Sequence, residues 1–287
     1  MIGRIRDLVS TSALAAALVV AAGACRGQAP RPAPSPRVVS LVPSVTETVF
    51  AMGMGDHLVG ATRYCTRPEA ARAVPRVGGL LDVSIEAVLA ARPDVVIGSR
   101  AVLTGRLADT LSAAGVRLVP VWLETAGDIG PGILAIGEAL GRPGRAAALV
   151  ASVERDLAAL GGGALREPPV RVLFVVGRSP LVVAGPTSFL GDLLGRMGVT
   201  NVVPAGRVPF PIWSLEEVIR SDPDVVVDGA VEAGDLASVL REAGLRVAAE
   251  GRIVRLAGDA VLRPGPGAAS AALPLADAIL KAAGGRQ

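Results

Sequence analysis

The sequence has few of the residues that most often bind metal ions or act as catalytic bases. It contains one histidine, His57, and two cysteines among 287 residues. Aromatic residues are also scarce, with two Trp, one Tyr and four Phe. A histidine-rich zinc or manganese receptor is therefore nearly excluded. A Ser or Cys catalytic triad is improbable for the same reason, because it needs a histidine as its base.

Charge is also limited, with 29 basic and 26 acidic residues and Lys281 as the only lysine. This small excess does not indicate nucleic acid as a partner, since no block of like charge or basic–aromatic alternation accompanies it. The chain has no Gly-x-x-x-x-Gly-Lys phosphate loop. The segment Gly177-Arg-Ser179 lacks the last glycine of a nucleophile elbow. We therefore predict that the protein is not an enzyme, and an enzyme on a related α/β scaffold is the less favoured alternative.

The first residues have the pattern of a secretory signal. Arg4 and Arg6 precede an apolar run over residues 13–22. That run is too short to cross a bilayer as a stable helix. We predict that residues 1–24 are a signal peptide, and no later apolar stretch reaches membrane-spanning length unbroken by charge or proline.

Two kinds of processing fit the end of this leader. Ala22-x-Ala24 suits ordinary signal cleavage, whereas small residues directly before Cys25 resemble a bacterial lipobox. We favour lipidation of Cys25, although Ala22 stands where a lipobox usually has leucine. Residues 25–36 are rich in Pro and Ala and are predicted to be a tether.

A repeated unit organises the rest of the chain. The pattern of residues 84–98 returns at residues 214–228, with residue numbers 130 higher. In each copy a serine begins a predicted helix, Pro-Asp follows it, and a Val-rich strand comes next. Copies this far apart indicate two related lobes, since solenoid repeats recur every 20–50 residues or so.

Strands alternate with helices throughout, which is typical of parallel sheets whose ligands lie beyond the carboxyl ends of the strands. We predict an α/β fold of two Rossmann-like lobes, joined by a single long helix over residues 145–160. The lobes span residues 37–125 and 164–287, with connecting helices over residues 126–163. Within the first lobe, Ser44 to Glu47 reads as a capping box that starts a helix.

Several stretches resemble a known family. They are residues 40–47, residues 59–64, Val77-Gly-Gly79, both copies of the Ser-x-Glu unit and residues 207–211. The chain resembles the substrate-binding proteins of ABC importers that have a helical backbone between two lobes, and within them the cobalamin-binding branch.

The resemblance implies a function. A corrinoid would be captured between the lobes and delivered to a permease with its ATPase subunits, by an extracytoplasmic monomer without a cofactor or a resident metal. Siderophore and haem receptors share the scaffold, so a ferric siderophore or haem stays an alternative. An anionic siderophore would need clustered arginines, for which the candidates are Arg63, Arg67, Arg100 and Arg207.

Two glutamates are implied to dock on the permease. In the resembled family one glutamate at the tip of each lobe meets permease arginines, and these positions fall on Glu86 and Glu216. Both occupy the second position of a predicted helix, where a carboxylate also stabilises the helix dipole. Their place in the repeat therefore has a structural explanation as well as a functional one.

The predicted ligand-binding residues lie in loops that follow strands. Tyr64 and Phe210 match positions where the resembled cobalamin binders have aromatic residues, whereas Leu80 and Ser99 stand where those proteins can have tryptophan. Lobe packing is the alternative role for Tyr64 and Phe210, and more so for Trp122 and Trp213. The complete set is Pro43, Ser44, Arg63, Tyr64, Leu80, Ser99, Arg100, Phe210, Trp213, Asp259 and Arg263.

Cys65 follows Tyr64 in one of these loops. If Cys25 is lipidated, Cys65 has no disulfide partner. Two roles remain open for it, contact with the metal of a ligand or an inert, half-buried position. His57 begins a predicted strand and is expected to serve packing or the surface.

Overall fold

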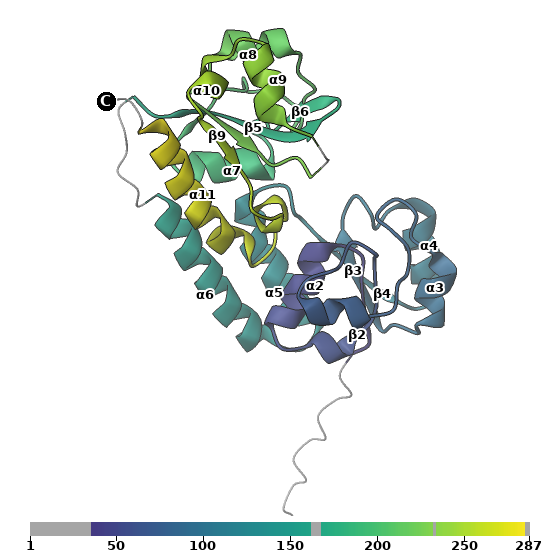
Figure 1. Cartoon of the computed structure of the whole chain (residues 1–287). Helices are drawn as coiled ribbons and strands as arrows, with labels where there is room; N and C mark the ends of the chain where they lie inside the picture. The colour runs from purple at the N-terminus through teal and green to yellow at the C-terminus, as the bar shows by residue number, and fades with distance from the viewer. Residues whose placement is uncertain (1–35, 162–167, 232–233, 285–287) are drawn as a thin grey trace, which may run out of the picture. The chain divides into compact units, whose positions relative to one another are not determined.

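The computed structural model describes residues 36–161, 168–231 and 234–284. The predicted signal peptide and Cys25 lie outside these residues. The described elements form two α/β lobes, each around its own sheet, and a layer of long helices (Figure 1). The predicted fold class is confirmed.

The sheet of the first lobe, here called the N-lobe, has four parallel strands in the order β2-β1-β3-β4. Its central strand β1 is fully buried, as expected for a parallel sheet covered on both faces. The strands are β1 (Val38–Ser40), β2 (Leu58–Ala61), β3 (Val95–Ser99) and β4 (Arg117–Val121). The helices are α2 (Pro43–Ala51), α3 (Ile85–Ala90) and α4 (Gly105–Ala113), with short 3-10 turns at Gly55–His57 and Glu69–Ala73.

The second lobe, the C-lobe, repeats this arrangement and adds a hairpin. Strands β7, β5, β8 and β9 are parallel, while β6 pairs antiparallel with β5 in a hairpin. The strands are β5 (Arg171–Arg178), β6 (Leu181–Val183), β7 (Thr200–Asn201), β8 (Val225–Asp228) and β9 (Ile253–Arg255). The helices are α7 (Phe189–Arg196), α8 (Leu215–Ser221), α9 (Leu236–Glu242) and α10 (Arg246–Ala249).

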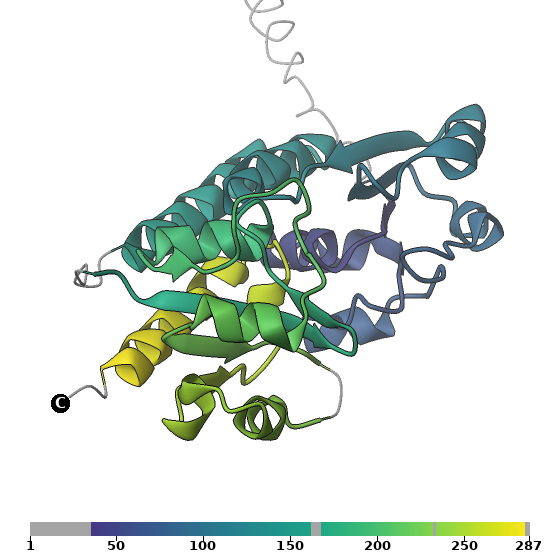
Figure 2. The same cartoon turned by 90° about the horizontal axis from the view of Figure 1, so that it is seen from above.

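Three helices make up the layer beside the lobes. They are α5 (Ile129–Ala139), α6 (Pro143–Leu160) and α11 (Ala268–Ala283), with 3-10 turns at Ala126–Asp128 and Ala260–Leu262. Helix α6 is the predicted connecting helix, and it begins at Pro143 because proline is well tolerated at the first helical position. The last helix, α11, runs along α6 in both views (Figures 1 and 2). The connection is therefore a packed layer and not one helix alone.

The repeated unit is confirmed at the start of its helices. Ser84 Oγ accepts a hydrogen bond from Ala87 N (3.1 Å) at α3, and Ser214 Oγ accepts one from Glu217 N (3.3 Å) at α8. In the second copy the Glu217 side chain also accepts from Ser214 N (2.7 Å), which completes a capping box. Each bond satisfies one of the backbone donors that a helix start leaves unpaired.

The two copies also end in the same way. Arg92 and Asp222 are the only described residues other than glycine with positive φ, at 47° and 36°. Two residues later, Asp94 accepts from Arg37 N (2.7 Å), and Asp224 accepts from Arg171 N (3.1 Å). Each aspartate thus ties the turn before one strand to the start of the neighbouring strand.

The predicted capping box at Ser44 is wrong. Helix α2 begins at Pro43, one residue before Ser44, and its N-cap residue Val42 has no capping side chain. Ser44 lies inside the first turn, where its carbonyl accepts from Thr48 Oγ1 (2.7 Å). The Glu47 side chain is used elsewhere, in an ion pair with Arg263 (2.6 Å).

Within the part of the chain that the structure describes, no helix is both long and apolar enough to span a bilayer.

Candidate functional site between the lobes

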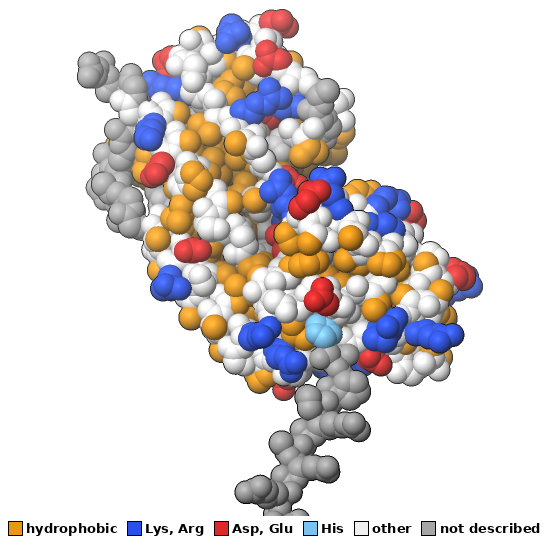
Figure 3. All heavy atoms as spheres, turned by 60° about the horizontal axis from the view of Figure 1, so that its bottom comes forward, with side chains coloured by type: hydrophobic (Ala, Val, Ile, Leu, Met, Phe, Trp, Pro, Cys, Tyr) orange, Lys and Arg blue, Asp and Glu red, His pale blue; other side chains and the backbone are white. Residues whose placement is uncertain are grey.

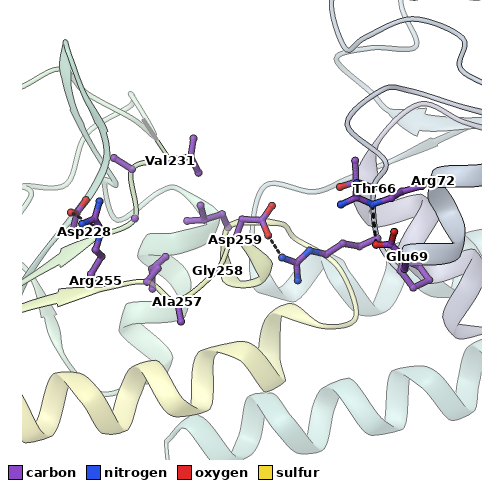
Figure 4. A pocket seen from close by; sticks show the side chains of 15 residues that line it. Thr66, Glu69, Arg72, Asp228, Val231, Arg255, Ala257, Gly258 and Asp259 are labelled. Atoms are coloured by element: carbon purple, nitrogen blue, oxygen red, sulfur yellow. Dashed lines mark ion pairs between the residues drawn. The ribbon is translucent and has the colours of Figure 1, made fainter. Parts of the chain in front are cut away.

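A cavity of about 670 Å³ opens between the two lobes (Figure 4). Its N-lobe wall is the loop that follows β2, and its C-lobe walls follow β8 and β9. These loops leave the carboxyl ends of parallel strands, where ligands of such sheets bind. The lining residues are Thr66–Glu69, Arg72, Asp228–Val231, Arg255–Asp259 and Leu262. The volume suits a small-molecule ligand.

The described lining of the cavity is charged and balanced. It contains three arginines, Arg67, Arg72 and Arg255, and three carboxylates, Glu69, Asp228 and Asp259. Each arginine faces one carboxylate: Arg72–Glu69 at 3.0 Å, Arg67–Asp259 at 2.8 Å and Arg255–Asp228 at 4.0 Å. Figure 3 shows charged side chains of both signs side by side where the lobes meet. No aromatic side chain is among these described lining residues.

Asp228 is the last residue of β8 and a buried part of the cavity lining in the C-lobe. Its side chain is 4% exposed, and both carboxylate oxygens accept from Arg178 Nη2 at 2.8 Å. Arg178 ends the neighbouring strand β5. A buried carboxylate is costly without such a partner, so this pair holds a negative charge in place at the cleft.

Two ion pairs join the lobes at the back of the cleft. Asp259 of the C-lobe pairs with Arg67 of the N-lobe (2.8 Å) and with Arg263. Arg263 in turn pairs with Glu47 of α2 (2.6 Å), and both side chains are about 85% buried, with exposed fractions of 14% and 15%. Burial raises the pKa of Glu47, because desolvation outweighs the attraction of Arg263.

Two predicted site residues therefore have structural contacts. Arg263 is held by Glu47 and Asp259 and does not line the large cavity. Ser44 is buried against Gly265, where a Cβ atom would lie 3.1 Å from that of Ser44. Pro43 is the first residue of α2. Together with Gly265, Arg263 fixes the loop before α11 on the first turns of α2.

Tyr64 and Arg63 lie beside the cavity lining and not in it. Tyr64 is 52% exposed and comes two residues before the lining residue Thr66. The Arg63 guanidinium lies 5.5 Å from the centre of the Tyr64 ring and pairs with Asp82 (2.5 Å). Cys65, between Tyr64 and Thr66, is fully buried, with Sγ 3.2 Å from Thr62 Oγ1. Its burial leaves it no surface for a ligand's metal, so the inert alternative is the better description.

The remaining predicted residues are spread over several surfaces. Arg100 follows the β3 residue Ser99 and stacks on Trp122 at 4.2 Å. Leu80 and Phe210 are exposed by 36% and 44%. Trp213 lines a separate pocket of about 300 Å³ in the C-lobe. His57 is partly buried in a 3-10 turn on the surface of the N-lobe, visible in pale blue in Figure 3.

Of the eleven predicted ligand-binding residues, the structure places Asp259 in the lining of the large cavity. The predicted arginine cluster does not form there either, since Arg67 is its only member among the described lining residues. The prediction missed Arg72, Asp228 and Arg255. Asp228 had a signal in the sequence, because it closes the second copy of the repeat at a strand's carboxyl end. The ligand-binding roles of all eleven residues stay predictions.

Glu86 and Glu216 have equivalent surroundings. Both are fully exposed, and each occupies the second position of its helix. The pKa of each is lowered, first by a hydrogen bond to its own backbone N–H and then by the cap serine. Both carboxylates are therefore exposed and charged at neutral pH.

The described residues contain no cluster of three His, Cys, Asp or Glu side chains that would hold a metal ion. What the cleft offers instead is charge-assisted hydrogen bonding from three guanidiniums and three carboxylates, with short aliphatic walls from Val231, Leu256 and Leu262. That chemistry can hold a polar ligand reversibly.

Comparisons with known proteins bear on the family and the fold. The family model described as periplasmic binding protein matches residues 38–241. The Vitamin B12-binding protein of Yersinia pestis (strain Pestoides F) is 27% identical over 194 residues, which cover 67% of this chain and 68% of that protein.

Two solved structures are similar over most of the chain. The periplasmic heme-binding protein RhuT from Roseiflexus sp. RS-1 is 32% identical, with a TM-score of 0.77, over 87% of this chain and 99% of that one. The periplasmic vitamin B12 binding protein BtuF of Vibrio cholerae shares the fold, with 23% identity and a TM-score of 0.76, over 87% and 98%.

Proposed function

Because the chain belongs to the periplasmic binding protein family, we propose that it captures a cobalamin-type corrinoid between its lobes and delivers it to an ABC importer. The family is one of extracytoplasmic substrate-binding proteins and not an enzyme family, so capture and release are proposed without a chemical step. Membrane attachment through Cys25 belongs to the same proposal and rests on the sequence alone.

The balanced charge of the cleft is the observation that carries the choice of ligand. Three arginines face three carboxylates across and along its walls. A corrinoid is fringed with neutral amides, which both donate and accept hydrogen bonds. Such amides can donate to the carboxylates and accept from the guanidiniums of the ion pairs in the cleft. A strongly anionic chelate would instead need an excess of arginine.

The names of the relatives support the same class of ligand. The curated relative is a B12-binding protein, and the solved relatives include a B12 and a heme binder. Both ligands are flat metal tetrapyrroles with polar groups at the rim. The proposal for this chain is therefore a metal tetrapyrrole, and within that class a corrinoid.

Haem is the second candidate, and Tyr64 is the observation in its favour. A tyrosine oxygen is one of the side-chain groups that hold haem iron. Tyr64 is half exposed, precedes the cavity lining by two residues and lies beside the Arg63 guanidinium.

Calorimetric titration of the exported protein with cyanocobalamin and, in parallel, with haemin tests the choice. Sub-micromolar binding of cyanocobalamin, with much weaker binding of haemin, is expected. Tight binding of haemin alone, lost in Tyr64→Phe, would replace the corrinoid by haem and keep the transport role. Binding of neither would overturn the proposal for this cleft.

A further inference from the structure

Asp259 forms ion pairs with two arginines at the cleft, one of them from the opposite lobe. It lies at the start of the 3-10 turn after β9, its side chain is 41% exposed, and it lines the cavity between the lobes (Figure 4). One oxygen pairs with Arg67 of the opposite lobe (2.8 Å), and the other pairs with Arg263. Its carboxylate therefore stands between two guanidiniums.

The other two carboxylates of the lining pair with arginines of their own lobe. Glu69 pairs with Arg72 in its own 3-10 turn and is 85% exposed. Asp228 is held at 2.8 Å by Arg178 beneath the wall and lies 4.0 Å from Arg255. Among the described lining residues, only Asp259 neutralises an arginine from across the cleft.

Arg263 has a second partner, which matters for what the loss of Asp259 would do. Its Nε pairs with the buried Glu47 carboxylate at 2.6 Å. Without the charge of Asp259, Arg263 keeps this partner and stays compensated. Arg67 has no other carboxylate partner among the ion pairs of the described residues, so its charge would be left facing the cavity.

We infer that Asp259 sets the charge preference of the cleft: by occupying Arg67 it disfavours ligands with carboxylates at their rim and leaves neutral, amide-fringed ligands favoured. The inference deepens the proposed function and rests on the same site. A ligand carboxylate near Arg67 would find the guanidinium already paired with Asp259 and would be repelled by the negative charge of Asp259. An amide would meet neither obstacle, since it can donate to one group and accept from the other.

The substitution Asp259→Asn tests this, because it removes the charge while keeping the shape and one acceptor for Arg67. Haemin is the anionic probe, through its two propionates, and cyanocobalamin is the neutral-rimmed probe. We expect haemin affinity to rise by roughly tenfold or more, as one charge-assisted hydrogen bond to Arg67 becomes available. Cyanocobalamin affinity is expected to change by less than about threefold.

Two further variants make the result specific. In Asp259→Asn/Arg67→Gln the gain for haemin should disappear. The matched control is Asp222→Asn, which also removes one C-lobe aspartate paired with an arginine, Arg246, but lies outside the cavity. Asn tolerates the positive φ of that position. Haemin affinity should be unchanged in this control.

The outcomes separate the inference from the proposed function. No gain of haemin affinity in Asp259→Asn, or an equal gain in Asp222→Asn, would overturn the inference while cyanocobalamin binding by the unaltered protein kept the function. A gain confined to Asp259→Asn, in a protein that binds no cyanocobalamin, would support the inference and overturn the ligand. Thermal unfolding of each variant identifies any loss of fold.

Discussion

In the N-lobe, strand β3 ends in Gly98 and Ser99, neither of which lines the cavity, whereas in the C-lobe the equivalent strand β8 ends at Asp228, which lines it together with Gly229. Behind these ends the lobes share strand order, helix caps and the aspartates that tie one strand to the next. The two lobes therefore have the same framework, while the carboxyl ends of these two strands differ. The shared positions are thus suited to a role that both lobes perform alike, and the differing positions to recognition of the ligand.

The largest effect is expected at the shared positions Glu86 and Glu216. If both lobes dock alike on permease arginines, Glu86→Arg and Glu216→Arg should each lower uptake by at least about tenfold, because like charges would then oppose each other. The double variant should abolish uptake. Affinity for the ligand should not change, since neither residue lines the cavity.

Uptake into vesicles that contain the importer, measured beside calorimetric titration, checks this. Glu154→Arg, an exposed position on α6, is the matched control and should transport normally. Unimpaired uptake by the double variant would refute the docking assignment. A loss in one single variant only would show that the lobes dock unequally.

The second largest effect is expected on stability, at the Arg178–Asp228 pair, which the N-lobe does not have. Arg178→Met leaves the buried Asp228 carboxylate with Arg255 at 4.0 Å as its remaining arginine in that wall. We expect the free energy of unfolding to fall by about 3 kcal/mol, the lower end of the range for breaking a buried ion pair. Urea denaturation measures it.

The companion variant Arg178→Met/Asp228→Asn removes the stranded charge and should recover part of that loss. If the free energy of unfolding of the single variant fell by less than about 1 kcal/mol, Asp228 would be solvated through the cleft. The Arg178–Asp228 pair would then contribute little to stability. The N-lobe offers no equivalent test, because Gly98 stands at the matching position of β3.

The smallest effect is expected at the helix caps, which sharpen the comparison. Ser84→Ala and Ser214→Ala each remove one side-chain acceptor from a helix start, at a cost of about 1 kcal/mol. The free energies of unfolding of the two variants, compared by denaturation with those of Ser112→Ala on α4, should fall by similar amounts. A much larger loss at either serine would show that the copies are not energetically equivalent.

The repeat was predictable from the sequence because its signals are local. Ser84, Pro93 and the Val-rich strand act within one helix or one turn, and the same holds for the second copy. The family could be predicted for the same reason, since its motifs lie in short segments. The starts of α3 and α8, at the cap residues Ser84 and Ser214, followed from these patterns.

The composition of the cleft was harder to predict. Glu47 was assigned to a local capping box, yet it pairs with Arg263, more than 200 positions later in the sequence. Arg67 and Asp259 likewise meet only after both lobes have folded. Local spacing has no information about such pairs. Asp228 was also missed, although its place at the carboxyl end of a strand in the repeat was a local signal that could have identified it.

The Glu47–Arg263 pair also bears on how cargo leaves the protein. It fastens the loop before α11 to α2, and Arg145 of α6 adds a hydrogen bond to the Met52 carbonyl (2.8 Å). Wide spontaneous opening of the cleft would have to separate this buried ion pair. Thermal motion seldom provides the free energy that this separation needs. The mechanical work of unloading would then come from the importer as it consumes ATP, and a cleft fastened in this way would deliver its cargo only where that machine is present.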